Sequence, residues 1–202
     1  MSIRSEIISS LDTLEYAEKE IGTVWRMPSP EDCIDFAGTE VGEVINDSIN
    51  MRSAGYARNN SQRSPEVAKE LADVAMMLLK YFASAYGFEK ARGMLDKIFG
   101  RAEKEVNGPD DELPGTFLEF LKMSGIDSKM LTDIAKISAL VSYAMMMMQA
   151  KGIGPNVDTI IASTLFLIAG NEMFSEKPLS EYIKDKIQAT IEKVKTRSMN
   201  IV

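Results

Sequence analysis

Four acidic residues form two pairs whose spacing suits a shared metal ion. Glu40 and Glu43 are three positions apart, and Glu70 and Asp73 repeat this spacing after an interval of 26 residues. Residues three apart are neighbours on a helix surface, so each pair would present two carboxylates side by side. Two such helices packed together would offer converging oxygen ligands, the kind that hold Mg²⁺ while water and substrate phosphate complete its octahedron.

The surroundings of the second pair strengthen this interpretation. Apolar residues point in most directions around the helix expected at 65–86, so this helix should be largely buried. Burying unpaired carboxylates is costly, and Glu70 and Asp73 therefore need a cation. The first pair borders an apolar stripe in the segment 39–47, where Asp47 is an auxiliary candidate for the metal. The alternative for both pairs is a helix face with ordinary salt bridges.

The chain contains no histidine and one cysteine, Cys33. This composition excludes a Ser-His-Asp or Cys-His mechanism and a zinc site built on histidine, and it weakens the case for a di-iron bundle with Glu-x-x-His motifs. Chemistry is left to carboxylates, lysines, hydroxyls or a bound metal. Cys33 lacks a second thiol for an internal disulfide, and the reducing cytoplasm is the expected location.

The composition is typical of a soluble globular protein, and a small anionic substrate is possible if metal ions screen the repulsion. Of the 202 residues, 45% are hydrophobic and 26% are charged, and the formal net charge is -7. Nucleic-acid-binding domains usually carry a basic surplus on one face, so no nucleic-acid partner is expected. The N-terminal segment lacks a signal-peptide pattern, and the run TIIASTLFLIAG is shorter than the roughly 20 residues that cross a bilayer, so no membrane partner is expected either.

Helical periodicity extends along nearly the whole sequence, which predicts an all-α fold packed as helical bundles. Residues 1–106 would form a catalytic half, residues 107–115 a linker, and residues 116–202 a degenerate second half without metal ligands. The helices are expected at about 3–21, 31–54, 65–86, 88–102, 128–152, 156–173 and 178–198. Ser29 before Pro30 and two acids indicates the start of the second of these helices.

The two halves show a weak internal repeat. A shift of 90 positions lays PEVAKELADVAMMLL, from Pro65, over PNVDTIIASTLFLIA, from Pro155. Ile160 and Ser163 then stand where the first half has Glu70 and Asp73, so the second half cannot form the same site. We interpret the pattern as a degenerate duplication. The alternative is that any two amphipathic helix pairs look somewhat alike.

The motif Glu40-Val-Gly-Glu43, followed by Glu70-Leu-Ala-Asp73, resembles the E-x-x-E…E-x-x-D signature of the MazG-like all-α nucleoside triphosphate pyrophosphohydrolases. The resemblance covers about residues 25–106. It implies Mg²⁺-dependent cleavage between the α and β phosphates of a (d)NTP, with Mn²⁺ as an acceptable substitute, giving the monophosphate and pyrophosphate. Carried over by position, Glu40, Glu43, Glu70 and Asp73 would bind the metal.

The group that activates water is less well defined. Many members of this family carry a further Glu just before the first motif, where this chain has Thr39. If that acid helps to activate water in relatives, Glu40 or Glu43 must take over here, or the rate is lower. These two acids are therefore the catalytic candidates. A non-catalytic nucleotide-binding or scaffolding bundle is the alternative class, and the base, the sugar and the pathway, including a phosphoribosyl-ATP pyrophosphohydrolase role, stay open.

Five further residues are candidates for substrate contacts: Trp25, Arg58, Asn59, Asn60 and Lys80. The loop residues, with Arg63, bring cations and amides near the expected place of a phosphate or base. The alternatives are a solvated loop, an acid partner for Lys80, and a core position for Trp25. MazG-like chains usually pair to complete their bundle, so the expectation is a homo-oligomer or, if the repeat is real, an internal pseudo-dimer.

Overall fold

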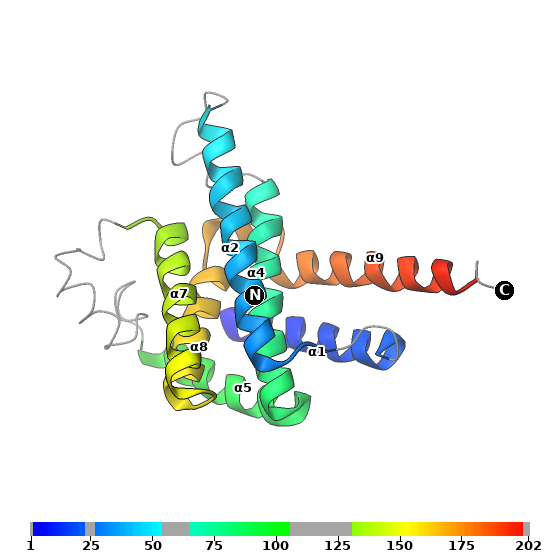
Figure 1. The fold of residues 1–202 in the computed structure, drawn as a ribbon, viewed down its shortest axis with the longest axis horizontal. Helices are drawn as coiled ribbons and strands as arrows, with labels where there is room; N and C mark the ends of the chain where they lie inside the picture. Colours follow the sequence, from blue (N-terminus) through cyan, green and yellow to red (C-terminus); the bar gives the residue numbers. More distant parts are fainter. Residues whose placement is uncertain (1, 23–26, 54–64, 106–130, 200–202) are drawn as a thin grey trace.

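The computed structural model describes residues 2–22, 27–53, 65–105 and 131–199, which form seven α-helices and one short 3-10 helix (Figure 1). The elements are α1 (Ile3–Ile21), α2 (Pro30–Ser53), α4 (Pro65–Tyr86), α5 (Phe88–Glu105), α7 (Asp133–Lys151), α8 (Pro155–Ala169), η2 (Glu172–Phe174) and α9 (Leu179–Met199). No β-strand occurs in these ranges, which confirms the predicted all-α class.

Side-chain caps mark the starts of several helices. The Ser2 side chain accepts a hydrogen bond from the backbone N–H of Ser5, and Thr132 does the same for Ala135. Ser29 accepts from the N–H of Asp32 at 3.1 Å, which confirms the helix start predicted from Ser29 and Pro30. Each cap satisfies one of the backbone donors that the first turn of a helix leaves unpaired.

The predicted helix at 156–173 is wrong at its C-terminal end. α8 ends at Ala169, Gly170 follows, and the chain then turns through η2. Asn171 caps this short helix by accepting from the N–H of Met173, and Phe174 is buried. The apolar pattern continued past Ala169 because the 3-10 turn also buries its phenylalanine. The preceding helix was predicted to start near residue 128, which lies outside the described residues. In the described part of the chain, α7 begins at Asp133.

The pair α2 and α4 runs side by side in opposite directions through the centre of the molecule (Figure 1). α7 packs on α2, and α8 lies against both α7 and α4. α1 and α9 pack along each other, with α5 against α1 and α4. α9 also contacts α4, which brings a helix from the end of the chain next to the pair that carries the acidic motifs.

The buried apolar residues form one core to which all seven α-helices contribute. α4 is its centre, because its residues from Leu71 to Ala83 are almost all buried, as the sequence predicted. Phe99 of α5 stacks on Phe166 of α8 with ring centroids 6.0 Å apart, so the core continues from the first half into the second.

A buried carboxylate also joins the two halves. Asp158 of α8 accepts hydrogen bonds from the hydroxyl of Tyr81 at 2.8 Å and from that of Tyr86 at 2.7 Å, both on α4. Asp158 is 6% exposed. Each of its two oxygens thus accepts a hydrogen bond, and these bonds offset the free-energy cost of burying the carboxylate.

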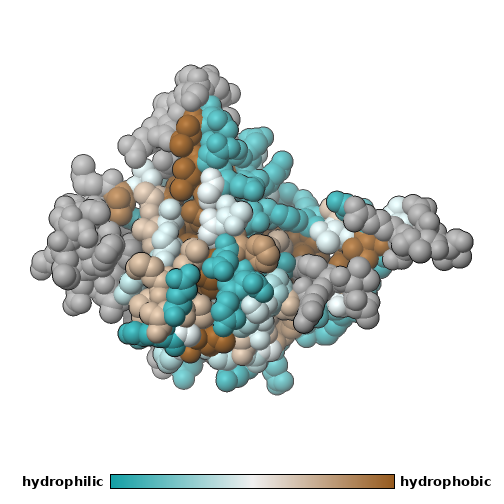
Figure 2. All heavy atoms as spheres, viewed as in Figure 1, coloured by the Kyte–Doolittle hydropathy of each residue, from teal (hydrophilic) through white to brown (hydrophobic). Residues whose placement is uncertain are grey.

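Figure 2 shows apolar residues in a line along α2, where Ile45 and Ile49 are 37% and 46% exposed. Within the described residues no helix has the length and apolar character needed to cross a membrane.

Candidate metal centre

Three of the four predicted metal ligands converge. Glu40 and Glu43 of α2 and Glu70 of α4 each offer a carboxylate oxygen, and these oxygens lie within 4.8 Å of one another. The spacing of three residues places the first two on one face of α2, and the packing of α2 on α4 brings Glu70 opposite them. Glu40 and Glu70 are half-buried, whereas Glu43 is exposed. The group therefore opens towards solvent on the Glu43 side.

The fourth predicted ligand, Asp73, is paired with a lysine. One turn beyond Glu70 on α4, its Oδ2 accepts a short hydrogen bond from the Nζ of Lys186, which α9 contributes. Asp73 is 7% exposed. Because a buried carboxylate needs a positive partner, the ammonium group supplies the cation that the sequence led us to expect from a metal.

Burial and mutual repulsion raise the pKa of the acids in this group. The pKa of Glu70 rises to about 7, first because of burial and then because of the nearby carboxylates of Asp73, Glu43 and Glu40. The pKa of Glu40 rises for the same reasons, burial first and then Asp73. Burial also raises the pKa of Asp73, although the Lys186 ammonium offsets part of that rise. The carboxylates at this site therefore carry more negative charge than the nearby lysines neutralise.

Lys80, a candidate for contact with the substrate, is buried on α4. The residue is 3% exposed, since α4 is covered on nearly all sides, and burial lowers the pKa of Lys80 to about 8. The Asp73 and Glu40 carboxylates oppose that decrease. Cys33 of α2 is also buried, and burial raises the pKa of its thiol to about 12. Cys33 is thus a protonated core residue, and contact of Lys80 with substrate stays a prediction.

The structure describes only some of the remaining candidates. Trp25, Arg58, Asn59, Asn60 and Arg63 fall outside the described residues. Asp47 is half-buried one turn beyond Glu43 and is not one of the three converging acids. The Thr39 hydroxyl donates to the carbonyl of Asp35 at 3.3 Å within its own helix. Thr39 thus satisfies its hydroxyl within α2 and adds no carboxylate to the group.

Lys186 is the residue at this site that the sequence did not reveal. It lies 113 positions from Asp73, and half of its side chain is exposed. Its helix buries Ile183 and Ile187, and Lys186 borders that apolar face. A lysine beside an apolar stripe is common on surface helices, so only the packing of α9 on α4 identifies its partner.

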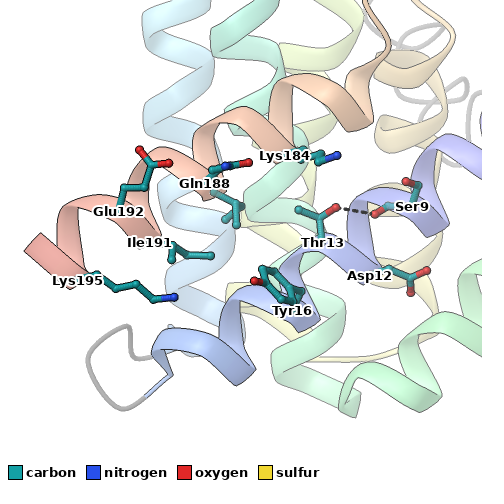
Figure 3. A pocket seen from close by; sticks show the side chains of 10 residues that line it. Ser9, Asp12, Thr13, Tyr16, Lys184, Gln188, Ile191, Glu192 and Lys195 are labelled. Carbon is teal, nitrogen blue, oxygen red and sulfur yellow. Dashed lines mark hydrogen bonds between the residues drawn. The ribbon is translucent and has the colours of Figure 1, made fainter.

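A groove of about 610 Å³ lies elsewhere, between α1 and α9 (Figure 3). Its walls include Asp12, Thr13, Lys184, Gln188 and Lys195, and the figure shows these side chains coming from the two helices. None of the lining residues is a predicted site residue. The acidic group and this groove are therefore separate features.

The donor set of the acidic group fits a hard divalent cation. Glu40, Glu43 and Glu70 provide carboxylate oxygens only, and the described part of the chain contains no histidine that could select a softer metal. Oxygen ligands of this kind suit Mg²⁺ and Mn²⁺. Burial and then the carboxylates of Asp73, Glu43 and Glu40 raise the pKa of Glu70, and a divalent cation would favour its charged form.

Comparison with known proteins adds no relative to this picture. The chain matches no family model, no curated protein and no solved structure.

Proposed function

We propose that this protein is a metal-dependent nucleoside triphosphate pyrophosphohydrolase of the MazG-like type. The observation that carries the proposal is the convergence of Glu40, Glu43 and Glu70 from two packed helices, at the positions of the two acidic motifs. Exposed acids alone would be weak support. The buried position of Asp73 and the raised pKa of Glu70 add to it, because ordinary solvated glutamates show neither feature.

The chemistry follows from the charges. A bound Mg²⁺ would neutralise the triphosphate, polarise the α-phosphorus and lower the pKa of an attacking water. Glu70 and one or both of Glu40 and Glu43 would hold the metal, and Asp73 would join them after leaving Lys186. Because Thr39 bonds within its own helix, Glu40 or Glu43 would accept the proton of the attacking water. Cleavage between the α and β phosphates then yields the monophosphate and pyrophosphate.

The second half is proposed to be a degenerate copy that serves as an internal partner. Two neighbouring helix pairs support this view, since α2 lies against α7 and α4 against α8. At the positions that match Glu70 and Asp73, Ile160 is buried in the core and the Ser163 hydroxyl donates to the Thr159 carbonyl. The second pair thus offers no carboxylate at these two positions, and Ile160 is used for packing.

A non-catalytic nucleotide-binding bundle is the second candidate. The ion pair between Asp73 and Lys186 favours it, because a lysine that neutralises a predicted ligand could stabilise the fold with no metal at all. The two candidates differ in whether nucleotide is consumed.

The test is a panel of (d)NTPs incubated with Mg²⁺, in which release of pyrophosphate is measured. Wild-type protein should release pyrophosphate from at least one nucleotide, and Glu43→Gln and Asp73→Asn should each lower the rate by more than about 10-fold, since even partners of metal ligands contribute that much. The matched control is Glu66→Gln, an exposed acid one turn before Glu70 on α4, which should keep the wild-type rate. Release that both variants retain would overturn the proposal.

A further inference from the structure

We propose that Lys186 is a resident counter-ion that competes with the divalent cation for Asp73, so that metal binding requires the lysine to leave. The inference rests on the proposed function, because it concerns the same carboxylates. It assigns a role to α9, an element outside both acidic motifs. The second half would thereby act on the site even though it lacks metal ligands of its own.

The position of the lysine allows such an exchange. Its ammonium bonds to a carboxylate that is 7% exposed, while the Lys186 side chain itself is 47% exposed. The stem therefore reaches from the surface into the site, and the ammonium can return to water without any helix moving. Lysine suits this behaviour because it is a compact charge on a flexible four-carbon stem.

The charges around Lys186 indicate what would replace it. Its ammonium acts on Asp73, Glu40 and Glu70. These three acids and the neighbouring Glu43 carry more negative charge than Lys186 and the buried Lys80 can neutralise. A divalent cation carries twice the charge of an ammonium and can bind several of these oxygens at once. An ammonium that stayed on Asp73 would repel it, so the two cations should exclude each other.

Titration with Mn²⁺ in the absence of nucleotide tests this inference. Lys186→Gln removes a competitor and a positive charge at short range, so the dissociation constant for Mn²⁺ should decrease by roughly 10-fold. Lys186→Arg keeps the charge and should stay close to the wild-type value. The control is Lys184→Gln on the same helix, because Lys184 is exposed and lines the groove against α1 instead (Figure 3). This variant should bind Mn²⁺ as the wild type does.

The outcomes separate this inference from the proposed function. If the wild type binds Mn²⁺, and Glu43→Gln weakens that binding, but Lys186→Gln leaves the affinity unchanged or lower, the competition is contradicted and the metal site stands. A structural role for Lys186 would give this lower affinity, because the site would be distorted. If the wild type binds no Mn²⁺, both the proposed function and the competition fail.

A measurement on the wild type avoids dependence on the folding of any variant. NMR signals of the lysine ammonium groups can be followed while Mg²⁺ is added. The signal of Lys186 should change in proportion to metal occupancy, whereas that of Lys184 should not. A Lys186 signal that is the same without Mg²⁺ and at saturation would overturn the proposal.

Discussion

At the scale of single residues, Glu70 is the group whose protonation should most affect the fold. Its carboxyl is half-buried and faces three other acids, which together with burial raise its pKa from 4.5 to about 7. An acid with a higher pKa in the folded state binds its proton more tightly there than in the unfolded chain. Its deprotonation therefore lowers stability unless a cation arrives.

The metal-free protein should consequently lose stability as the pH rises from about 4.5 to about 7. In this window the folded state binds more protons than the unfolded state, so the free energy of unfolding decreases with pH. Chemical denaturation in EDTA at a series of pH values measures the slope. Glu70→Gln should flatten it, and the control Glu66→Gln should leave it unchanged. Equal slopes for the wild type and Glu70→Gln would contradict the raised pKa.

The sequence predicted the acids of the site but not their partner. Glu40, Glu43 and Glu70 could be predicted because a spacing of three is a local property of a helix. The lysine on Asp73 could not, because it depends on how α9 packs 113 residues further along the chain. The burial of Lys80 could not be predicted for a related reason, since the depth of a residue on a buried helix is set by the helices that cover it.

At the scale of elements, the contact of α4 with α8 depends on a buried polar group. Asp158 is buried between two tyrosines of α4, and each hydroxyl donates to one of its oxygens. Removing either donor would leave a buried charge partly unsatisfied. This arrangement should therefore contribute more to stability than an exposed ion pair does.

Tyr81→Phe should lower the free energy of unfolding by about 2 kcal/mol, because hydrogen bonds to charged groups contribute about 1.5–3 kcal/mol. Urea denaturation measures the change. The matched control is Tyr16→Phe, whose side chain is 56% exposed, and it should change stability by less than about 0.5 kcal/mol. Equal effects of the two substitutions would show that Asp158 does not need the Tyr81 hydroxyl.

Most of the helices could be predicted from the sequence because their caps and periodicity are local. The bounds expected for α1 and α4 agree with the structure, and Ser29 starts α2 as its sequence suggested. The end of α8 was missed because the apolar pattern runs on to Phe174. In that segment a 3-10 helix follows the α-helix, and it buries Phe174 as a continued α-helix would have been expected to do.

At the scale of the whole molecule, the two halves share one core. α1 packs along α9, α2 on α7, and α4 on α8, so every helix of the first half except α5 has an extensive neighbour in the second. The sequence predicted two related halves but could not show how they pack. An apolar helix face indicates that a surface is buried, but it does not indicate which helix covers that surface.

A chain shortened to residues 1–106 should therefore fail to fold cooperatively. It would expose the apolar faces of α1, α2 and α4 that the second half covers, and burial of such surfaces is the main source of stability. Circular dichroism during heating measures this, with the full chain as the control, which should melt in one transition. A cooperative transition of the short chain would contradict the shared core.

The proposed cleavage of a nucleoside triphosphate is tested most directly by identifying the products. Phosphorus NMR of a (d)NTP panel incubated with the protein and Mg²⁺ distinguishes cleavage between the α and β phosphates from any other hydrolysis. We expect the signals of at least one nucleotide to be replaced by those of its monophosphate and of pyrophosphate, and EDTA to stop this change. A panel in which every nucleotide stays intact, or yields a diphosphate and inorganic phosphate, would contradict it.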